Sequence, residues 1–555
     1  MKRITIMCCM AIAAAVPMRL AAQGSKQVEV TKVYVPQVGD ARKPAVAVDM
    51  TDTVRMRPDI DYSITPHTWQ TSLKMRDFNP ATATYWDYNR PKLFYARLAA
   101  GYPLTTAGDL YLTTHNPKIG YAGVYVNHEG DFQPRSTFLG DRLSMGESSS
   151  MRNRAGVRGG IYAGRHMAEI DLDYNNDMFH RYPVAAAPRL QYEHMGGSVR
   201  FGDDFADLSR FNFNLELHGR YWHDCHVPEG EYGRNMKRFG GSFALAREFG
   251  RNRIDIDLAC DVWRGGKALS EAGDSRAEVG VRYVRSMTRS TLSVGLAYQY
   301  DKLRVRSTAS HYILPSLRWA WDRRNAAFAP YLELVSSVTD NDFMSLVERN
   351  PYIGFDARTS EAIVSMPSTR NYDVRAGFTG VAARGRLSYG AYVGVSMIID
   401  QVFWYNYDAA WFGAETADNN RFVFDARIEY RPIGALTLSG GVTLHGDNTD
   451  SDLYCPEPDI AGELGVRYKH RRFVVSAGVE VLGSRKWSVI NRPGLEYGYF
   501  SVPATADVSL GFDWIIDNRW TVCVEGRNLA NMKLYDWANY YRNSINFQAG
   551  VKVNF

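Results

Sequence analysis

Hydrophobic and polar residues alternate along most of this chain, and the last ten residues show the pattern most clearly. The apolar positions are Phe547, Ala549, Val551, Val553 and Phe555, and the positions between them are Asn546, Gln548, Gly550, Lys552 and Asn554. Successive side chains of a strand point to opposite faces, so this segment predicts a strand with one apolar and one polar face. Such a strand, ending in an aromatic residue, is typical of the strand that closes a membrane β-barrel, although a soluble edge strand would show the same alternation.

The same alternation recurs from Leu93 to the end of the chain in segments of about ten residues, which suits a tilted strand crossing a hydrocarbon core of about 30 Å. Clear examples are residues 169–175, 211–220, 292–301 and 507–514. Aromatic residues gather near the segment ends, as in the interfacial girdles of membrane barrels. These residues include Tyr221, Tyr300, Trp319, Trp514 and Trp520.

Counting the segments predicts an all-β fold, a transmembrane antiparallel β-barrel of about 22 strands; merging or splitting the weaker regions 109–128 and 311–335 would give about 20 or 24. The expected strands begin near residues 93, 109, 121, 153, 166, 195, 211, 235, 252, 275, 289, 311, 328, 371, 385, 421, 436, 461, 472, 506, 520 and 545. A barrel of this size encloses a lumen wide enough to need a plug.

The connections between these segments alternate between short and long. The tight ones lie at 250–253, 285–289, 383–385, 469–472 and 516–519. The long ones lie at 131–150, 178–194, 342–368, 402–420, 446–460 and 484–505. Outer-membrane barrels have short periplasmic turns and long outer loops, so the one-sided loops favour such a barrel over a soluble sandwich. An even strand count places both chain ends in the periplasm.

Composition agrees with this fold class. The 555 residues are 13% aromatic and include 47 glycines, yet the mean hydropathy is −0.32. Beyond the extreme N-terminus there is no apolar run of about eighteen residues, which excludes a helical membrane protein. A barrel fits a low mean hydropathy because half of each strand faces water. Removing Lys2, Arg3 and Arg19 with the expected signal peptide lowers the formal net charge from +5 to +2, which gives no reason to expect a nucleic-acid partner.

The N-terminal part differs from the rest and divides the chain into three segments. Residues 1–22 are expected to be a signal peptide, with Lys2 and Arg3 before an apolar stretch and a small-residue cleavage site. Residues 23–92 hold six prolines and lack sustained alternation, so we expect a short irregular arm in the periplasm or threading the lumen. Residues 93–555 are the barrel, and the predicted location is the bacterial outer membrane.

The last hairpin of the chain resembles that of a known family. Residues 525–531 (Glu-Gly-Arg-Asn-Leu-Ala-Asn), followed by Tyr535, Trp537, Tyr541, Arg542 and the closing Phe555, are similar to the last hairpin of TonB-dependent receptor barrels, and the whole chain looks most like those of Bacteroidota. The resemblance implies a receptor or transporter. Members of that family carry a glycine-rich plug domain, and residues 23–92 do not resemble one. By analogy with a TonB box, the strand-like stretch containing Val28, Val30, Val33 and Val35 could contact a periplasmic energising or accessory protein. The alternative is an arm packed in the lumen.

Candidate ligand-binding residues are aromatic. Trp404, Tyr405, Tyr407 and Trp411 lie in one predicted loop and Trp487 in another, where flat rings could stack on a sugar or another planar solute. The alternative for these rings is an interfacial girdle at the strand ends. Charged residues of both signs are expected to line the lumen and to pair across neighbouring strands; they are Asp255, Asp257, Asp425, Arg427, Glu429, Arg467 and Lys469.

No catalytic constellation stands out, so we expect no enzyme activity and no cofactor. His223-Asp-Cys-His226 with Glu229 and Glu231 has metal-compatible residue types, but its spacing fits no established site and we assign no metal to it. Cys260 shares a strand face with apolar residues and should face lipid. Cys225 and Cys455 lie in predicted outer loops and could pair in an oxidising compartment.

The sequence therefore predicts an outer-membrane receptor or transport-type barrel, resembling TonB-dependent receptors, that binds or passes a solute through a large occluded lumen. The alternative is a structural or assembly barrel that anchors a secretion or uptake complex and transports nothing. The expected partners are the lipid bilayer of the outer membrane and the barrel-insertion machinery. That machinery would recognise the closing strand through Phe547, Val551, Val553 and Phe555.

Overall fold

The computed structural model describes residues 93–555, except 117, 133–134, 140–141, 147, 183–187, 204, 206, 322–325, 409, 491–496 and 543. The predicted signal peptide and arm lie outside the described residues, and so do Val28, Val30, Val33 and Val35. No helix of the part that the structure describes is both long and apolar enough to cross a membrane.

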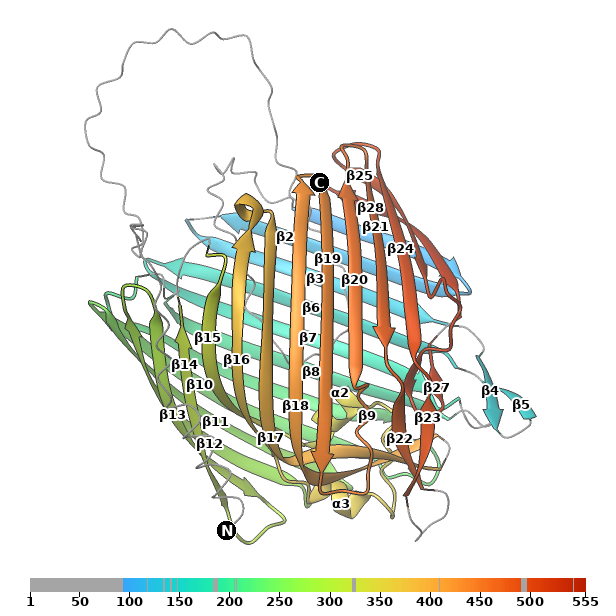
Figure 1. Ribbon diagram of the computed structural model, residues 1–555. Coiled ribbons are helices and arrows are strands. Elements are labelled where there is room, and N and C mark those ends of the chain that lie inside the picture. Colours follow the sequence, from blue (N-terminus) through green and yellow to red (C-terminus); the bar gives the residue numbers. More distant parts are fainter. Residues whose placement is uncertain are drawn as a thin grey trace, which may run out of the picture. The chain divides into compact units, whose positions relative to one another are not determined.

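Within the described chain, 22 antiparallel strands close into a barrel (Figure 1). The first eleven are β1 (Phe94–Tyr102), β2 (Thr105–Asn116), β3 (Gly120–Asp131), β6 (Ser150–Ala163), β7 (His166–His180), β8 (Arg189–Asp203), β9 (Asn212–His226), β10 (Arg234–Phe249), β11 (Asn252–Lys267), β12 (Gly273–Ser286) and β13 (Thr291–Leu303). The others are β14 (Ser310–Ala320), β15 (Ala329–Thr339), β16 (Thr369–Ala382), β17 (Leu387–Asp408), β18 (Trp411–Ile433), β19 (Leu436–Thr449), β20 (Ile460–Lys469), β21 (Phe473–Leu482), β24 (Thr505–Ile515), β25 (Trp520–Arg527) and β28 (Asn546–Asn554).

The remaining elements belong to the connections. They are the hairpin of β4 (Arg135–Leu139) and β5 (Arg142–Gly146), the helices α2 (Phe343–Arg349) and α3 (Ser360–Val364), the 3-10 turn η1 (Ala383–Gly385), the hairpin of β22 (Arg485–Ile490) and β23 (Tyr497–Val502), and the hairpin of β26 (Tyr535–Trp537) and β27 (Tyr540–Tyr541). The β22–β23 hairpin joins the main sheet through a short parallel pairing of Tyr405 and Asn406 with Ser488 and Val489.

The predicted closing strand is confirmed. β1 pairs with β2 on one side and with β28 on the other, so the first and last strands seal the ring. At the seam the Phe94 amide donates to the Phe555 carbonyl at 3.2 Å, and the Phe555 amide donates to the Phe94 carbonyl at 2.9 Å. Phe547, Val551 and Phe555 are exposed on the outer wall and Val553 is half-buried, in agreement with the predicted apolar face.

The barrel wall has the two faces that the alternation predicts. Leu217, Leu296 and Leu464 are 57%, 57% and 66% exposed on the outside, and this apolar surface suits contact with lipid acyl chains. Cys260 is also exposed, as expected for a lipid-facing residue. Among the inward-facing groups, Lys552 of β28 contacts Asp513 of β24 at 2.8 Å.

One prediction about the inner charges is wrong in part. Several of the named residues pair along one strand rather than across strands: Arg253 with Asp255 at 2.7 Å, Arg427 with Asp425 at 3.4 Å, and Arg431 with Glu429 at 2.7 Å. Residues two apart on a strand share a face, so a long arginine side chain can reach back to its own neighbour. Pairing across strands does occur elsewhere, as between Arg200 and Glu169 at 2.8 Å.

Each predicted strand start has an observed counterpart, and the largest displacement is at β18, which begins at Trp411 rather than near 421. The prediction of a long loop at 402–420 was therefore wrong, because β17 and β18 extend past the membrane-crossing region as a long hairpin. Its residues do not alternate between apolar and polar because the hairpin packs against other loops rather than between lipid and water.

The two ends of the barrel differ as predicted. The turns near 250, 384 and 517 are short and lie at the end that holds the C-terminus, which is called the turn end below. α2 and α3 lie at the opposite end, called the loop end (Figure 1). In an outer-membrane barrel the turn end faces the periplasm and the loop end faces the exterior.

Candidate functional site: an aromatic cap at the loop end

A compact assembly of loop residues, called the cap below, lies at the loop end of the barrel. It consists of residues 342–368, which include α2 and α3, and residues 534–541, which include the β26–β27 hairpin. The α2 helix has only seven residues, too few for a helix to be stable alone. The Asp342 carboxylate caps its first turn by accepting a hydrogen bond from the Ser345 amide at 2.9 Å. Its buried residues are Phe343, Met344, Leu346 and Val347.

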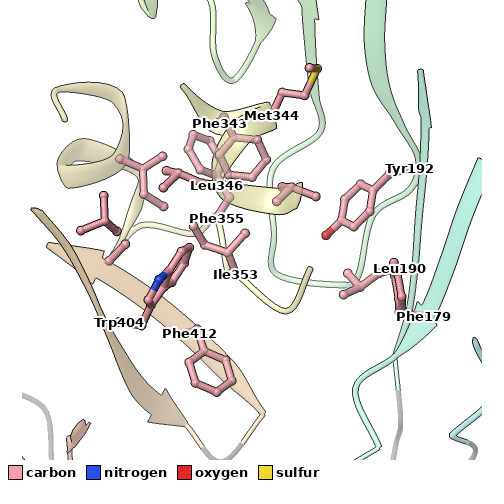
Figure 2. Packing of buried hydrophobic residues seen from close by; sticks show 14 of the residues in the cluster. Phe179, Leu190, Tyr192, Phe343, Met344, Leu346, Ile353, Phe355, Trp404 and Phe412 are labelled. Atoms are coloured by element: carbon pink, nitrogen blue, oxygen red, sulfur yellow. The ribbon is translucent and has the colours of Figure 1, made fainter. Parts of the chain in front are cut away.

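The cap packs between two opposite walls of the barrel. β7 and β17 are the fifth and fifteenth strands of a ring of 22, and therefore face each other across it. β8 lies beside β7 in the same wall. One hydrophobic cluster includes Leu190 and Tyr192 from β8, Phe343 and Ile353 from the cap, and Trp404 from β17. Figure 2 shows the cap side chains lying between the strand that carries Tyr192 and the strands that carry Trp404 and Phe412.

Hydrogen bonds attach the cap to both walls. On one wall the Tyr192 hydroxyl donates to the Pro351 carbonyl at 3.0 Å. On the other, the Tyr540 hydroxyl donates to the Ala410 carbonyl at 2.7 Å. The two parts of the cap meet where the rings of Tyr352 and Tyr540 stack with centroids 3.6 Å apart. A continuous set of contacts thus crosses the ring from β8 to the β17–β18 hairpin.

The buried carboxylate of Glu231, in the β9–β10 connection, joins several of these parts. It pairs with Arg181, and it accepts hydrogen bonds from the Trp411 indole at 2.9 Å and the Phe355 amide at 3.3 Å. Arg181 also donates to the Ile353 carbonyl at 2.9 Å, and its guanidinium lies 4.9 Å from the Trp411 ring centroid. The side chains of Arg181 and Glu231 are 0% and 3% exposed, so each charge depends on the other for compensation.

A second group of charges attaches the start of the cap to the wall formed by β10–β12. Arg238 of β10 contacts Asp340 at 2.8 Å and Asp342 at 3.5 Å. Arg276 of β12 also pairs with Asp340. Burial, together with the neighbouring Asp340 carboxylate, raises the pKa of Asp342, although hydrogen bonds from Ser345 and the charge of Arg238 oppose this. Two arginines thus hold two carboxylates at the base of α2.

The five aromatic residues proposed as ligand contacts all lie at the loop end, but most are buried there. Trp404, Tyr405 and Trp487 are 7%, 7% and 4% exposed. Trp404 and Trp487 belong to the large cluster, which Trp411 contacts. Tyr405 belongs to a smaller cluster with Phe403 and Leu453, against which Tyr407 packs. An interfacial girdle does not describe these rings, because girdle residues are exposed to the membrane surface. Ligand contact by them stays a prediction.

Sequence reasoning missed the residues that hold this assembly together. Trp537 is a hub, with its ring centroid 5.5 Å from that of Trp404 and 5.5 Å from that of Phe412. Arg181 and Glu231 carry the buried ion pair. The sequence shows Trp537 only as part of a family-like hairpin and Glu231 only as a metal-compatible residue, and no local pattern indicates that Glu231 and Arg181 pair in the interior.

The cysteines and the metal-compatible stretch are placed differently from expectation. Cys225 and Cys455 are both free, so the pairing considered for them does not form. Cys225 lies within β9 rather than in a loop. The Cys455 sulfur accepts a hydrogen bond from the Arg421 guanidinium at 3.1 Å. The carboxylates of Asp224 and Glu231 each pair with a buried arginine: Asp224 with Arg234 at 2.6 Å, and Glu231 with Arg181. The six metal-compatible residues of this stretch therefore do not all converge on one point, although His223 and Cys225 lie close together.

The described residues define a class of protein by their geometry: a large outer-membrane β-barrel with a packed loop end. Solved structures share that fold. The copper transporter OprC aligns with a TM-score of 0.63 at 13% identity, covering 84% of this chain and 81% of that one. The FrpB iron transporter from Neisseria meningitidis gives 0.65 at 10% identity, covering 84% and 82%. The ferripyoverdine receptor of the outer membrane of Pseudomonas aeruginosa gives 0.62 at 11% identity, covering 84% and 72%.

No protein-family model and no curated protein matches the sequence. The similarity to the solved structures is therefore one of fold. It extends over the barrel and agrees with the resemblance of the last hairpin.

Proposed function

We propose that this chain is an outer-membrane receptor or transporter of the TonB-dependent type, whose loop end is closed by the cap until solute passage requires it to open. The observation that carries this proposal is the shared 22-strand fold, because proteins named as transporters and receptors align over 84% of the chain. The cap supports the occluded lumen, since its contacts cross the ring from one wall to the other.

The solutes to test first are metal ions and metal complexes. The similar structures are named for copper, iron and ferripyoverdine, and a receptor of this class would meet its solute at the loop end. Trp404, Trp411 and Trp487 then act as ligand contacts only after the cap loosens, because most of their surface now packs against protein.

Tryptophan fluorescence of the purified barrel tests this role directly. Titration with Cu²⁺, Fe³⁺ or a ferric siderophore should change the emission of the cap in a saturable way. The change should be lost when Trp411 and Trp487 are both replaced by Phe, while replacing Trp319 and Trp514 on the barrel wall should leave it unaffected. If none of these solutes produces a saturable change, metal solutes are the wrong class.

The second candidate function is a structural or assembly barrel that transports nothing. The cap favours the structural role in one respect. A barrel that transports nothing needs no opening at its loop end, and the cap contacts both walls there. The arm, residues 23–92, can distinguish the two candidates. We propose that it occludes the lumen or contacts a periplasmic partner. In the second case it would pair with the partner as an added strand through Val28, Val30, Val33 and Val35. Used as bait, this arm should capture a TonB-like energising protein if transport is active. Capture of only secretion or assembly components would favour the structural role.

A further inference from the structure

Three side chains with metal-ligating atoms meet on the outer wall of the barrel, away from the lumen. Glu193 of β8 lies directly across from His223 of β9 in the strand register. Cys225 follows His223 by two residues, so both point to the same face. A ligating atom from each of the three lies within 4.8 Å of the others. Asp224 lies on the other side of the strand, opposite Tyr192, and Glu193 comes from a different strand, which is why the local sequence spacing did not reveal the set.

The site lies just beyond the apolar band of the wall, towards the loop end. The outward-facing Met195 of β8 and Leu217 of β9 are exposed apolar residues. Beyond Gly219, Tyr221 is the next outward side chain along β9 in that direction and resembles a girdle residue. The three ligating residues follow, at the level where the strands leave the membrane and meet polar headgroups and water.

The spacing of the ligating atoms fits a tetrahedral metal ion. The His223 Nε2 atom lies 3.6 Å from Glu193 Oε2 and 3.5 Å from Cys225 Sγ. Zinc bonds of about 2.0–2.3 Å at tetrahedral angles place neighbouring N, O and S ligands roughly 3.3–3.6 Å apart. Both distances from the imidazole thus agree with a common ion between the three groups, with little rearrangement of the side chains.

Neighbouring side chains hold two of the ligands in place. The Asn176 amide of β7 donates to Glu193 Oε1 at 2.7 Å, which leaves Oε2 directed at the imidazole. The His223 ring stacks on Tyr221 with centroids 5.4 Å apart and planes inclined by 22°. Outer contacts of this kind orient metal ligands and raise metal affinity.

A local irregularity brings in the thiol. The β8–β9 register shifts between Gln191 and Tyr192, so the residues from Asp224 to His226 oppose only two residues of β8 and Cys225 is the extra one. A β-bulge re-aims a side chain at the position where it occurs. At this bulge the Cys225 sulfur is directed towards the imidazole of His223.

We propose that Glu193, His223 and Cys225 form a binding site for a divalent transition metal of the zinc type on the outer wall of the barrel. On binding, the Cys225 thiol loses its proton to solvent and forms a sulfur–metal bond. The imidazole nitrogen and one carboxylate oxygen occupy two further positions. The fourth position stays open to water or to an oxygen of a lipid headgroup. The site joins β8 to β9 and takes no part in solute passage.

Cobalt titration of the full-length protein in detergent tests the site, because Co²⁺ takes the same ligands as Zn²⁺ and is visible spectroscopically. We expect one Co²⁺ per chain with a thiolate-to-cobalt charge-transfer band, which Zn²⁺ should abolish by displacement. Cys225→Ser should eliminate the band and His223→Ala should eliminate binding. Asn176→Ala should weaken binding about 10-fold, the usual effect of losing an outer contact.

Cys260→Ser is the matched control, since Cys260 is also exposed but belongs to no group of metal-ligating side chains within the described part of the chain. It should keep the band, and all variants should keep the heat-modifiable migration of a folded barrel. The proposal is overturned if the wild-type protein shows no thiolate–cobalt band, or if the band survives in Cys225→Ser. It is also overturned if the band disappears in Cys455→Ser instead. None of these outcomes depends on whether the barrel transports a solute.

Discussion

At the scale of single residues, the most consequential side chains are buried charges that no local pattern identifies. Glu231 binds Trp411, which lies 180 positions further along the chain, and Arg181 reaches the carbonyl of Ile353, 172 positions away. Alternation reveals which face of a strand a residue occupies, but the partner of a loop charge depends on how distant loops meet. The aromatic candidates show the same limit: their position at the loop end was predictable and their burial was not.

Glu231→Gln should loosen the cap without unfolding the barrel. The change leaves the guanidinium of Arg181 buried without its counter-charge, which typically costs about 3–5 kcal/mol. Hydrogen–deuterium exchange of residues 342–368 should therefore accelerate, whereas exchange in β11–β13 should not change.

Glu429→Gln is the control for that substitution, because the pair of Glu429 with Arg431 at 2.7 Å is exposed and such pairs contribute about 0–1 kcal/mol. If the two variants exchange equally slowly in the cap, the Glu231 ion pair does not hold it closed.

At the scale of elements, the strands were largely predictable and the cap was not. Lipid on one side and water on the other impose strict alternation, so segments such as 211–220 and 292–301 identified β9 and β13 from sequence. The alternation ends where the wall leaves the membrane, which is why the extension of β17 and β18 was taken for a loop. The α2 helix is short and depends on tertiary packing, so residues 342–368 indicated only a long connection.

Removal of Phe555 should impair assembly more than its replacement by alanine. Deletion removes both backbone hydrogen bonds with Phe94 at the seam, each contributing about 0.5–1.5 kcal/mol. Phe555→Ala loses only the aromatic ring, including its contact with Phe94 at 6.0 Å. The fraction of heat-modifiable protein in outer membranes should fall in the order wild type, Phe555→Ala, deletion.

Phe249→Ala provides the comparison for that series, since Phe249 is likewise an exposed aromatic residue near a periplasmic turn, 47% exposed. It should assemble normally. Equal losses in Phe249→Ala and in the Phe555 deletion would indicate a general need for exposed aromatic residues rather than a role of the closing strand.

At the scale of the whole molecule, the described chain combines a wide ring of strands with a loop end at which cap residues contact two opposite walls. A ring of 22 strands encloses a lumen too wide for the wall side chains to fill, and the cap supplies the missing packing by contacting both β8 and the β17–β18 hairpin. The sequence predicted the size of the ring and the need for some occlusion. It offered residues 23–92 as an arm that either lies in the periplasm or threads the lumen, whereas the structure adds residues 342–368 and 534–541 as candidates for the occlusion.

The most direct test is the conductance of purified protein in a planar bilayer, measured after deletion of residues 24–92 with and without the cap segment 342–368. We expect the protein that lacks only the arm to stay closed, because the cap still crosses the loop end. Replacing 342–368 by a short glycine–serine linker in that protein should open a large, stable conductance while heat-modifiable migration is retained. A large conductance from the protein that lacks only the arm, or none from the protein that lacks both segments, would contradict closure of the barrel by the cap.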